Sequence, residues 1–463
     1  MTVGSMFSIV IPTRNRPNTL PSTLRTCLDQ DFEDFEIVVF DNASDPETRR
    51  VVQQFSDPRI RFVHHPSALP MTASWNQALS HARGNWIVFI GDDDGLCPGA
   101  LRVLAEHISE YPEIRTIRWL WGAYTWPNIE PASESNRIRV PLFQDSQVVD
   151  SRERLLEMLT APGGPLVPHT YHALMHRSVI DRVLEKGAFF DGPYPDVASG
   201  TFSAMVTDRF LEIGQPLSFL GYSPTSTTMA QRSADTNSAT ASEFDQLNLA
   251  TRLHAHPDLP DAIDLAPITY WDAVFRARDR FAPLDPEFVL DPFTICQTAL
   301  DAAIVSGDRR DRQVRAVCEW WEANKGASTA ELRLPDETAG FEHERLVDTP
   351  GIYSDSVVID GNALGVTDAF GAAEAIGRAL SLKPTFEQIA AQHDKVIVDR
   401  EVQYRDLVGQ IEVLTSAVEQ LQAKAGRLQA KVEKLQARVA KLKSQASTPG
   451  TVSRVRRKLP FGK

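Results

Sequence analysis

NWIVFIGDDDGLCPGAL, residues 85–101, joins an apolar run to three consecutive aspartates. The β-branched and aromatic residues of Trp86–Ile90 predict a short buried strand. Asp92, Asp93 and Asp94 follow it directly, and neighbouring carboxylates repel one another unless a cation offsets their charge. A solvated turn is also rich in Asp and Gly. Such a turn does not explain the buried strand before it.

Strand and helix signals alternate through residues 7–100. We expect strands at Phe7–Ile11, Phe35–Phe40, Ile60–Val63 and Trp86–Ile90, and helices at Thr19–Leu28, Glu47–Phe55 and Ala73–Ala82. Strands separated by helices of about ten residues predict an α/β fold, with a parallel sheet covered by helices on both faces.

Polar residues gather where these strands end. Ligands of open parallel sheets bind beyond the carboxyl ends of the strands, so three clusters are expected at one edge: Thr13 with Arg14, Asp41 with Asn42, and Asp92 to Asp94. Asp92 and Asp94 are two residues apart and can turn toward one metal ion. Ligands that are all oxygens favour Mg²⁺ or Mn²⁺, which bind few carboxylates and leave positions open for phosphate oxygens. A nucleoside diphosphate group is the expected partner.

Three stretches, in this order and spacing, resemble the start of the family 2 glycosyltransferases. They are FSIVIPTRNRPNTL, VVFDNAS and ALSHARGNWIVFIGDDDGLCPGAL. The resemblance is close over residues 7–105 and looser to residue 230. It implies an inverting enzyme with the Rossmann-like GT-A fold and a nucleotide-sugar donor. The family pattern reads FLDSDD, and Gly91 takes the place of its first acid.

The resemblance also implies roles for individual residues. Asp94 matches the last acid of the family pattern and is the first candidate for the metal, with Asp92 second. Asp41 is expected to accept hydrogen bonds from the base or ribose, although it could instead cap the next helix. Arg83 could pair with a phosphate or with Asp92, or be an ordinary surface charge. The expected nucleotide-binding residues are Pro12, Thr13, Arg14, Asp41, Asn42, Arg83, Asp92 and Asp93.

The catalytic base of the family lies some hundred residues beyond the metal motif, before a helix. The matching stretch here is FFDGPYPDVASGTFSA. Asp196 opens a predicted helix after Pro195 and is the expected base, with Asp191 in reserve. The alternative is that Asp196 only caps the helix. Family enzymes more often carry an adjacent Glu-Asp pair here.

Three histidines lie upstream, in PHTYHALMHRS. His172 and His176 have the spacing of metal ligands on one helix face. No cysteine or acid nearby completes a zinc set, so we expect His169, His172 and His176 to be acceptor-site or core residues.

A heptad repeat runs through residues 397–442. Leucine occupies every d position, at Leu407, Leu414, Leu421, Leu428, Leu435 and Leu442. Position a is occupied by Ile411, Val418, Ala425, Val432 and Val439. This pattern favours a parallel two-stranded coiled coil and hence a homodimer, the alternative being one helix folded back on the body. The predicted domains are a GT-A domain (1–240), a mainly helical region (241–390), a coiled coil (391–445) and a basic tail (446–463).

Charge is unevenly distributed. From Gln422 onward there are twelve Lys and Arg against one acid, Glu433, which leaves about −24 for the rest of a chain whose total is −13. The tail is either a solvated end or a contact with anionic membrane lipid. No aromatic platform supports nucleic-acid binding. Four dispersed cysteines and no apolar run of membrane-spanning length predict a cytoplasmic location, peripheral to the membrane if the tail binds lipid.

Two other functions fit parts of the sequence. A catalytically degenerate module could hold a nucleotide sugar or glycan and oligomerise through the coil. A nucleotidyltransferase would need a glycine-rich loop after the first strand, and TRNRPNT has no glycine. The sequence does not distinguish UDP, GDP and dTDP donors, nor glycan, lipid-linked and protein acceptors.

Overall fold

The computed structural model describes residues 5–160, 167–226, 229, 254–262, 265–283, 285–303, 308–325, 329–334, 347–353 and 355–381. All of them belong to one compact unit, residues 1–390. The predicted coiled coil (391–445) and basic tail (446–463) lie outside the described residues. Among the residues that are described, no helix combines the length and apolar character needed to span a membrane.

Four parallel strands form one half of the sheet, in the order β3-β2-β1-β4. They are β1 (Phe7–Thr13), β2 (Phe35–Asn42), β3 (Ile60–His65) and β4 (Trp86–Phe89). This confirms the predicted α/β fold and its parallel sheet. Parallel strands buried on both faces are apolar almost without interruption, as the sequence of β1 and β2 is.

The other half of the sheet is mixed. Antiparallel pairs continue from β4 through β9 (Ala173–His176), β6 (Thr116–Thr125) and β7 (Arg137–Pro141). The long strand β10 (Arg209–Tyr222) runs parallel to β6. It also pairs antiparallel with β5 (Gly95–Leu96) and β8 (Gln147–Asp150). Through β5, β10 reaches the segment that carries the aspartates.

The sheet does not end within the predicted GT-A domain. Strand β12 (Ser356–Asp360) pairs antiparallel with β7, and β11 (Gly351–Ile352) pairs with β12. Helix α13 (Ala369–Ser381) packs its alanine-rich face on β6 and β7. The two short strands β11 and β12 fall in the region predicted as mainly helical, 241–390, which also contains α13 and the helices between residues 266 and 325.

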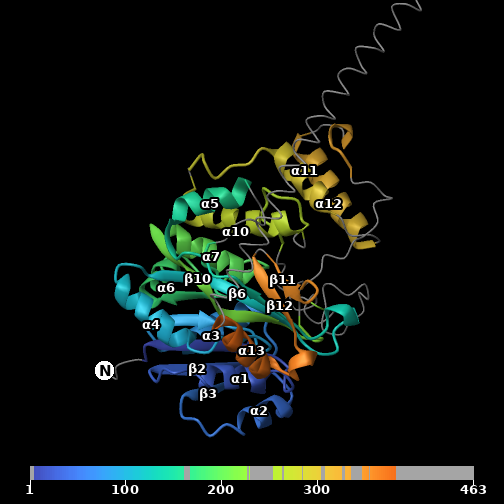
Figure 1. Ribbon diagram of the computed structural model, residues 1–463. Coiled ribbons are helices and arrows are strands. Elements are labelled where there is room, and N and C mark those ends of the chain that lie inside the picture. The colour runs from blue at the N-terminus through green and yellow to red at the C-terminus, as the bar shows by residue number, and fades with distance from the viewer. Residues whose placement is uncertain are drawn as a thin grey trace, which may run out of the picture. The chain divides into compact units, whose positions relative to one another are not determined.

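Helices cover both faces of the sheet (Figure 1). On one face, α1 (Leu20–Leu28), α2 (Pro46–Val52) and α4 (Ala100–Glu110) pack on Ile9 and Val39. Leu20 and Leu24 are fully buried there, and each contributes about 1.5–3 kcal/mol by leaving water.

The opposite face carries Val10, Val38 and Phe40. The helices of this core are α3 (Met71–His81), α5 (Ser151–Thr160), α6 (Arg177–Leu184), α7 (Pro195–Met205), α10 (Ala266–Phe281), α11 (Pro292–Ala302) and α12 (Asp308–Lys325). Short 3₁₀ turns lie at Ala132–Glu134, Thr329–Glu331 and Asn362–Leu364.

Candidate active site

Asp94 is the most firmly held of the three aspartates. Its Oδ1 accepts a hydrogen bond from the Gly221 amide (2.8 Å), and its Oδ2 accepts one from the Gly91 amide (2.6 Å). Only 3% of its surface is exposed. A Cβ on Gly91 would lie 2.8 Å from Asp94 Oδ2. The glycine that departs from the family pattern therefore makes room for this carboxylate.

Asp93 joins the aspartate segment to the end of β10. Its Oδ2 accepts a hydrogen bond from the Ser223 hydroxyl (2.6 Å), and its carbonyl oxygen accepts one from Trp126 Nε1 (3.0 Å). A Cβ on Gly221 would lie 1.8 Å from the Asp93 carbonyl oxygen, so only glycine lets β10 approach this closely. Among the described residues, nothing donates a hydrogen bond to Asp93 Oδ1.

Asp92 keeps the most exposed side chain of the three, at 14%. Its Oδ2 accepts a hydrogen bond from the Thr13 hydroxyl (2.6 Å), and Arg16 Nε lies 3.9 Å from its Oδ1. The structure thus brings the ends of β1 and β4 together, as predicted. Arg16, in the loop after β1, was not a predicted site residue, although it lies within the TRNR stretch.

The three carboxyl groups resist ionisation together. Burial raises the pKa of Asp92, and it raises the pKa of Asp94 to about 7. Burial also raises the pKa of Asp93 well above its ordinary value, and the charges of Asp94 and Asp92 add to this. A bound cation would reverse this cost.

The donor set fits a hard cation that shares its ligands with a phosphate. Within the described part of the chain, no three His, Cys, Asp or Glu side chains form a complete metal site. Mg²⁺ and similar ions are commonly held by one or two carboxylates plus substrate phosphates. Asp92 would hold such an ion, and Asp94 could add the lone pairs that its two amide donors leave.

Asp41 and Asn42, at the end of β2, are tied to their own neighbours. Asp41 Oδ2 lies 2.7 Å from His64 Nδ1, and its Oδ1 accepts a hydrogen bond from the Ser44 amide (3.0 Å). Asn42 exchanges two hydrogen bonds of 2.8 Å with the backbone of Leu69. Asp45 occupies the N-cap position of the helix that follows, so Asp41 is not its N-cap.

The remaining predicted nucleotide residues divide between the two edges of the sheet. Pro12 ends β1 beside Thr13, and Arg14 Nη1 donates to the Asn42 carbonyl oxygen (2.6 Å). Arg83 lies elsewhere. It precedes β4, and its backbone amide donates to the Glu36 carboxylate at the amino-terminal edge. The structure therefore does not bring Arg83 to Asp92.

Tyr171 lies beside the end of β4. Burial raises the pKa of its hydroxyl well above 10, and the charges of Asp94 and Asp196 add to this. Tyr171 bridges to Phe89, the last residue of β4, and its ring lies 5.1 Å from that of Trp75. No spacing in the sequence pointed to it. His169, two residues earlier, lies 3.9 Å from Asp196, so residues 169–171 connect the end of β4 with the predicted base.

Asp196 lies in the first turn of α7, and its side chain is 25% exposed. Burial raises its pKa, which makes it a stronger base than an ordinary aspartate. His169 Nδ1 lies 3.9 Å from its Oδ2, and burial lowers the pKa of His169 to about 3, so this imidazole is neutral at pH 7. The N-cap of α7 is Tyr194, so Asp196 is not the capping residue.

The histidine spacing does not come from a helix. His176 ends strand β9 and caps α6, where its side chain accepts from the Ser178 amide. His172 is 2% exposed, stacks on Trp121 with ring centroids 5.0 Å apart, and has Nδ1 2.6 Å from Ser218 Oγ. His172 is therefore a core residue, which is one of the two roles predicted for it.

Asp191 does not lie free in the site. Its Oδ2 accepts a hydrogen bond from Arg280 Nη2 (2.7 Å), and its Oδ1 accepts one from the Gly192 amide.

Residues 8–184 match the family model described as Glycosyl transferase family 2. This part of the chain is a family 2 glycosyl transferase domain. It carries the aspartates, Asp41 and Tyr171, whereas Asp191 and Asp196 lie beyond its matched end. The match confirms the resemblance, and the sheet described above confirms the α/β fold.

Curated relatives match the same domain. Over 107 residues the chain is 36% identical to the GalNAc(5)-diNAcBac-PP-undecaprenol beta-1,3-glucosyltransferase of Campylobacter jejuni, which is 22% of this chain and 35% of that protein. It is 32% identical over 104 residues to the putative colanic acid biosynthesis glycosyl transferase WcaA of Escherichia coli, which is 22% of this chain and 37% of that protein. The chain thus spans about a third of the length of these relatives.

Two solved structures are similar in part. Staphylococcus aureus TarS 1–349 in complex with UDP-GlcNAc aligns with 68% of this chain and 81% of its own, at 14% identity and a TM-score of 0.41. The mannosyltransferase PcManGT from Pyrobaculum calidifontis, in complex with GDP-Man and Mn²⁺, aligns with 84% of this chain and 87% of its own. The identity is 16% and the TM-score is 0.37.

Proposed function

We propose that this protein transfers a sugar from a nucleotide-diphosphate sugar to an acceptor hydroxyl, with inversion and with Mn²⁺ or Mg²⁺ as cofactor. The observation that carries the proposal is the course of residues 169–171: His169 Nδ1 lies 3.9 Å from Asp196 Oδ2, and Tyr171 pairs with Phe89, three residues before Asp92. This course supports placing the proposed cation-binding aspartates and the candidate base around one site. That arrangement suits a displacement in which the nucleophile and the leaving group lie on opposite sides of the anomeric carbon.

Each of these residues has a separate role in the proposed reaction. A bound divalent cation would offset the charge that develops on the leaving diphosphate. Thr13 orients Asp92 through its hydroxyl, and Arg16 adds positive charge beside it. Asp41 and Asn42 fix the loops that border the nucleotide. Asp196 takes the proton of the acceptor hydroxyl as that oxygen attacks.

The acceptor is proposed from the relatives. The Campylobacter jejuni enzyme is named for an undecaprenol-linked glycan. We propose a glycan acceptor for this chain as well, in the assembly of a surface polysaccharide or glycoconjugate.

Donor binding is expected to raise the melting temperature of the full chain. We would measure thermal unfolding with UDP-, GDP-, dTDP- and CMP-sugars in the presence of MnCl₂. A ligand at a hundred times its Kd stabilises the folded state by about 2.7 kcal/mol. One nucleotide class should give this shift, and EDTA should remove it. If no nucleotide sugar changes the melting temperature, the proposed donor site is wrong.

The heptad repeat supports a further proposal, that the chain forms a homodimer through residues 397–442. Replacing Leu421 and Leu428 by lysine places two charges in each d layer of the coil. Sedimentation should then give the mass of one chain instead of two. The matched control replaces Gln422 and Gln429, which are not core positions, by lysine. An unchanged mass in the leucine variant would show that the dimer contact is elsewhere.

A further inference from the structure

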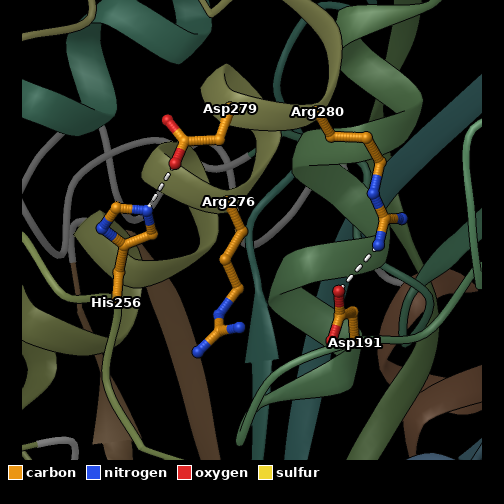
Figure 2. Close-up of a pocket in the computed structure, with 5 residues that line it drawn as sticks. All are labelled: Asp191, His256, Arg276, Asp279 and Arg280. Carbon is orange, nitrogen blue, oxygen red and sulfur yellow. Dashed lines mark hydrogen bonds and ion pairs between the residues drawn. The ribbon is translucent and has the colours of Figure 1, made fainter.

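A second pocket lies beyond the family 2 domain. It is an open depression of about 400 Å³, lined by five side chains: Asp191, His256, Arg276, Asp279 and Arg280. All five positions follow residue 184, where the family match ends. Three of the side chains come from the last turns of α10, one from the segment 254–262, and one from the loop before α7 (Figure 2).

Each basic side chain of the pocket is paired with an acid. Arg280 Nη2 donates to Asp191 Oδ2 (2.7 Å), and His256 Nε2 lies 2.8 Å from Asp279 Oδ2. Arg276, between these two pairs in Figure 2, donates through Nε to the buried Asp272 (2.8 Å). The pocket therefore has no excess positive charge, and an anion entering it would meet carboxylates.

Two of the paired groups also pack on aromatic rings. The Arg280 guanidinium lies over the Phe202 ring, 4.3 Å from its centroid, and the His256 ring contacts that of Phe275 at 5.7 Å. Side chains fixed in this way present donors and acceptors in set directions and lose little entropy when a ligand binds. A neutral ligand with many hydroxyl groups uses both kinds of group, because each hydroxyl donates and accepts.

Asp191, in the wall of the pocket, lies five residues before Asp196 in the chain. The Thr72 hydroxyl, in the first turn of α3, donates to the Gly192 carbonyl oxygen (2.9 Å), and α3 starts at the edge of the sheet where β3 ends. Burial raises the pKa of Tyr270, in α10, and the negative charge of Asp196 adds to this rise. Arg276 and Arg280 lie six and ten residues further along this helix, about 9 and 15 Å at 1.5 Å per residue.

We propose that this pocket binds hydroxyl groups of an uncharged sugar of the acceptor, one or two rings away from the hydroxyl that reacts. The assignment rests on the proposed function, which makes a glycan the acceptor. Arg280 and Asp279 contact the bound sugar, and α10 sets the distance between the pocket and Asp196.

Saturation-transfer NMR on the full chain tests the pocket with the methyl glycosides of glucose, galactose, mannose and N-acetylglucosamine as probes. At least one should bind. The variants Arg280→Gln and Asp279→Asn should weaken the binding of that probe at least tenfold. Asp279 is half exposed, so its asparagine variant keeps the fold even if the arginine variant does not. The matched control is Arg102→Gln, which removes an Arg–Asp pair on the surface helix α4 and should change nothing.

Three results would overturn the proposal: no glycoside binds, the variants bind as the parent does, or inorganic phosphate displaces the probe. The donor measurement is independent of this pocket. If nucleotide sugars fail to bind but a glycoside binds through Arg280 and Asp279, the proposed transferase function is wrong and the sugar pocket stands. If the donor binds and no glycoside does, only the pocket assignment is lost.

Discussion

Replacing Asp196 by asparagine is expected to abolish sugar transfer while donor binding is kept. A positioned base contributes about 10²–10⁴-fold to rate, so kcat should fall by that factor. Asparagine has the same shape as aspartate, and Asp196 is part exposed in the first turn of α7, so the fold should survive. Turnover with the identified donor and acceptor, beside the thermal shift given by the donor, measures both effects.

Asp191→Asn is the matched control for this variant. It makes the same chemical change five residues earlier, on a carboxylate already paired with Arg280. We expect it to raise the KM for the acceptor more than it lowers kcat. If Asp191→Asn abolishes turnover and Asp196→Asn does not, the base is Asp191.

The pH dependence adds a separate readout. A base acts when deprotonated, and burial raises the pKa of Asp196, so kcat/KM should rise with pH through a value above the ordinary 3.8. The same rise of kcat/KM with pH should be seen in the Asp191→Asn variant.

Replacing Asp92 by asparagine is the second change with a large expected effect. It should remove the response of turnover to Mn²⁺, because Asp92 is the most exposed carboxylate of the cluster. The fold should be no less stable, because the substitution keeps the Thr13 contact and removes one of three repelling charges. Turnover against Mn²⁺ concentration and the free energy of unfolding are the two measurements. Full, EDTA-sensitive turnover in Asp92→Asn would contradict the assignment.

Asp94→Ala should behave differently. It leaves the amides of Gly91 and Gly221 without their acceptor. A buried unsatisfied donor costs about 1–3 kcal/mol, so this variant should lose both activity and several kcal/mol of stability. A stable Asp94→Ala variant would mean that the two amide contacts do not hold the end of β10 in place.

The parallel half of the sheet was predictable because each element is coded locally. The apolar runs of β1, β2 and β4 and the helical spacing of Leu20 and Leu24 need no distant partner. The direction of each strand then places Thr13 and Asp92 at one edge. The same rule places Arg83 at the other edge, since it precedes Trp86. The sequence alone could therefore have excluded Arg83 as a nucleotide-binding candidate.

The rest depends on pairings between distant residues. Gly221 and Ser223 reach Asp94 and Asp93 only because β10 folds back beside them, about 130 residues later in the chain. Strand β12 joins β7 across more than 200 residues. His172 and His176 have helical spacing but lie on or beside a strand, because β9 is held between β4 and β6. No local pattern records these contacts.

Calorimetric titration of Mn²⁺ into the full chain, alone and with UDP, GDP or dTDP, tests the shared cation site most directly. One nucleotide should tighten Mn²⁺ binding, and Asp92→Asn should remove the binding heat that the nucleotide brings. Equal heats in the parent chain and in Asp92→Asn, or no Mn²⁺ binding with any of the three nucleotides, would show that the aspartates do not hold a cation together with a diphosphate.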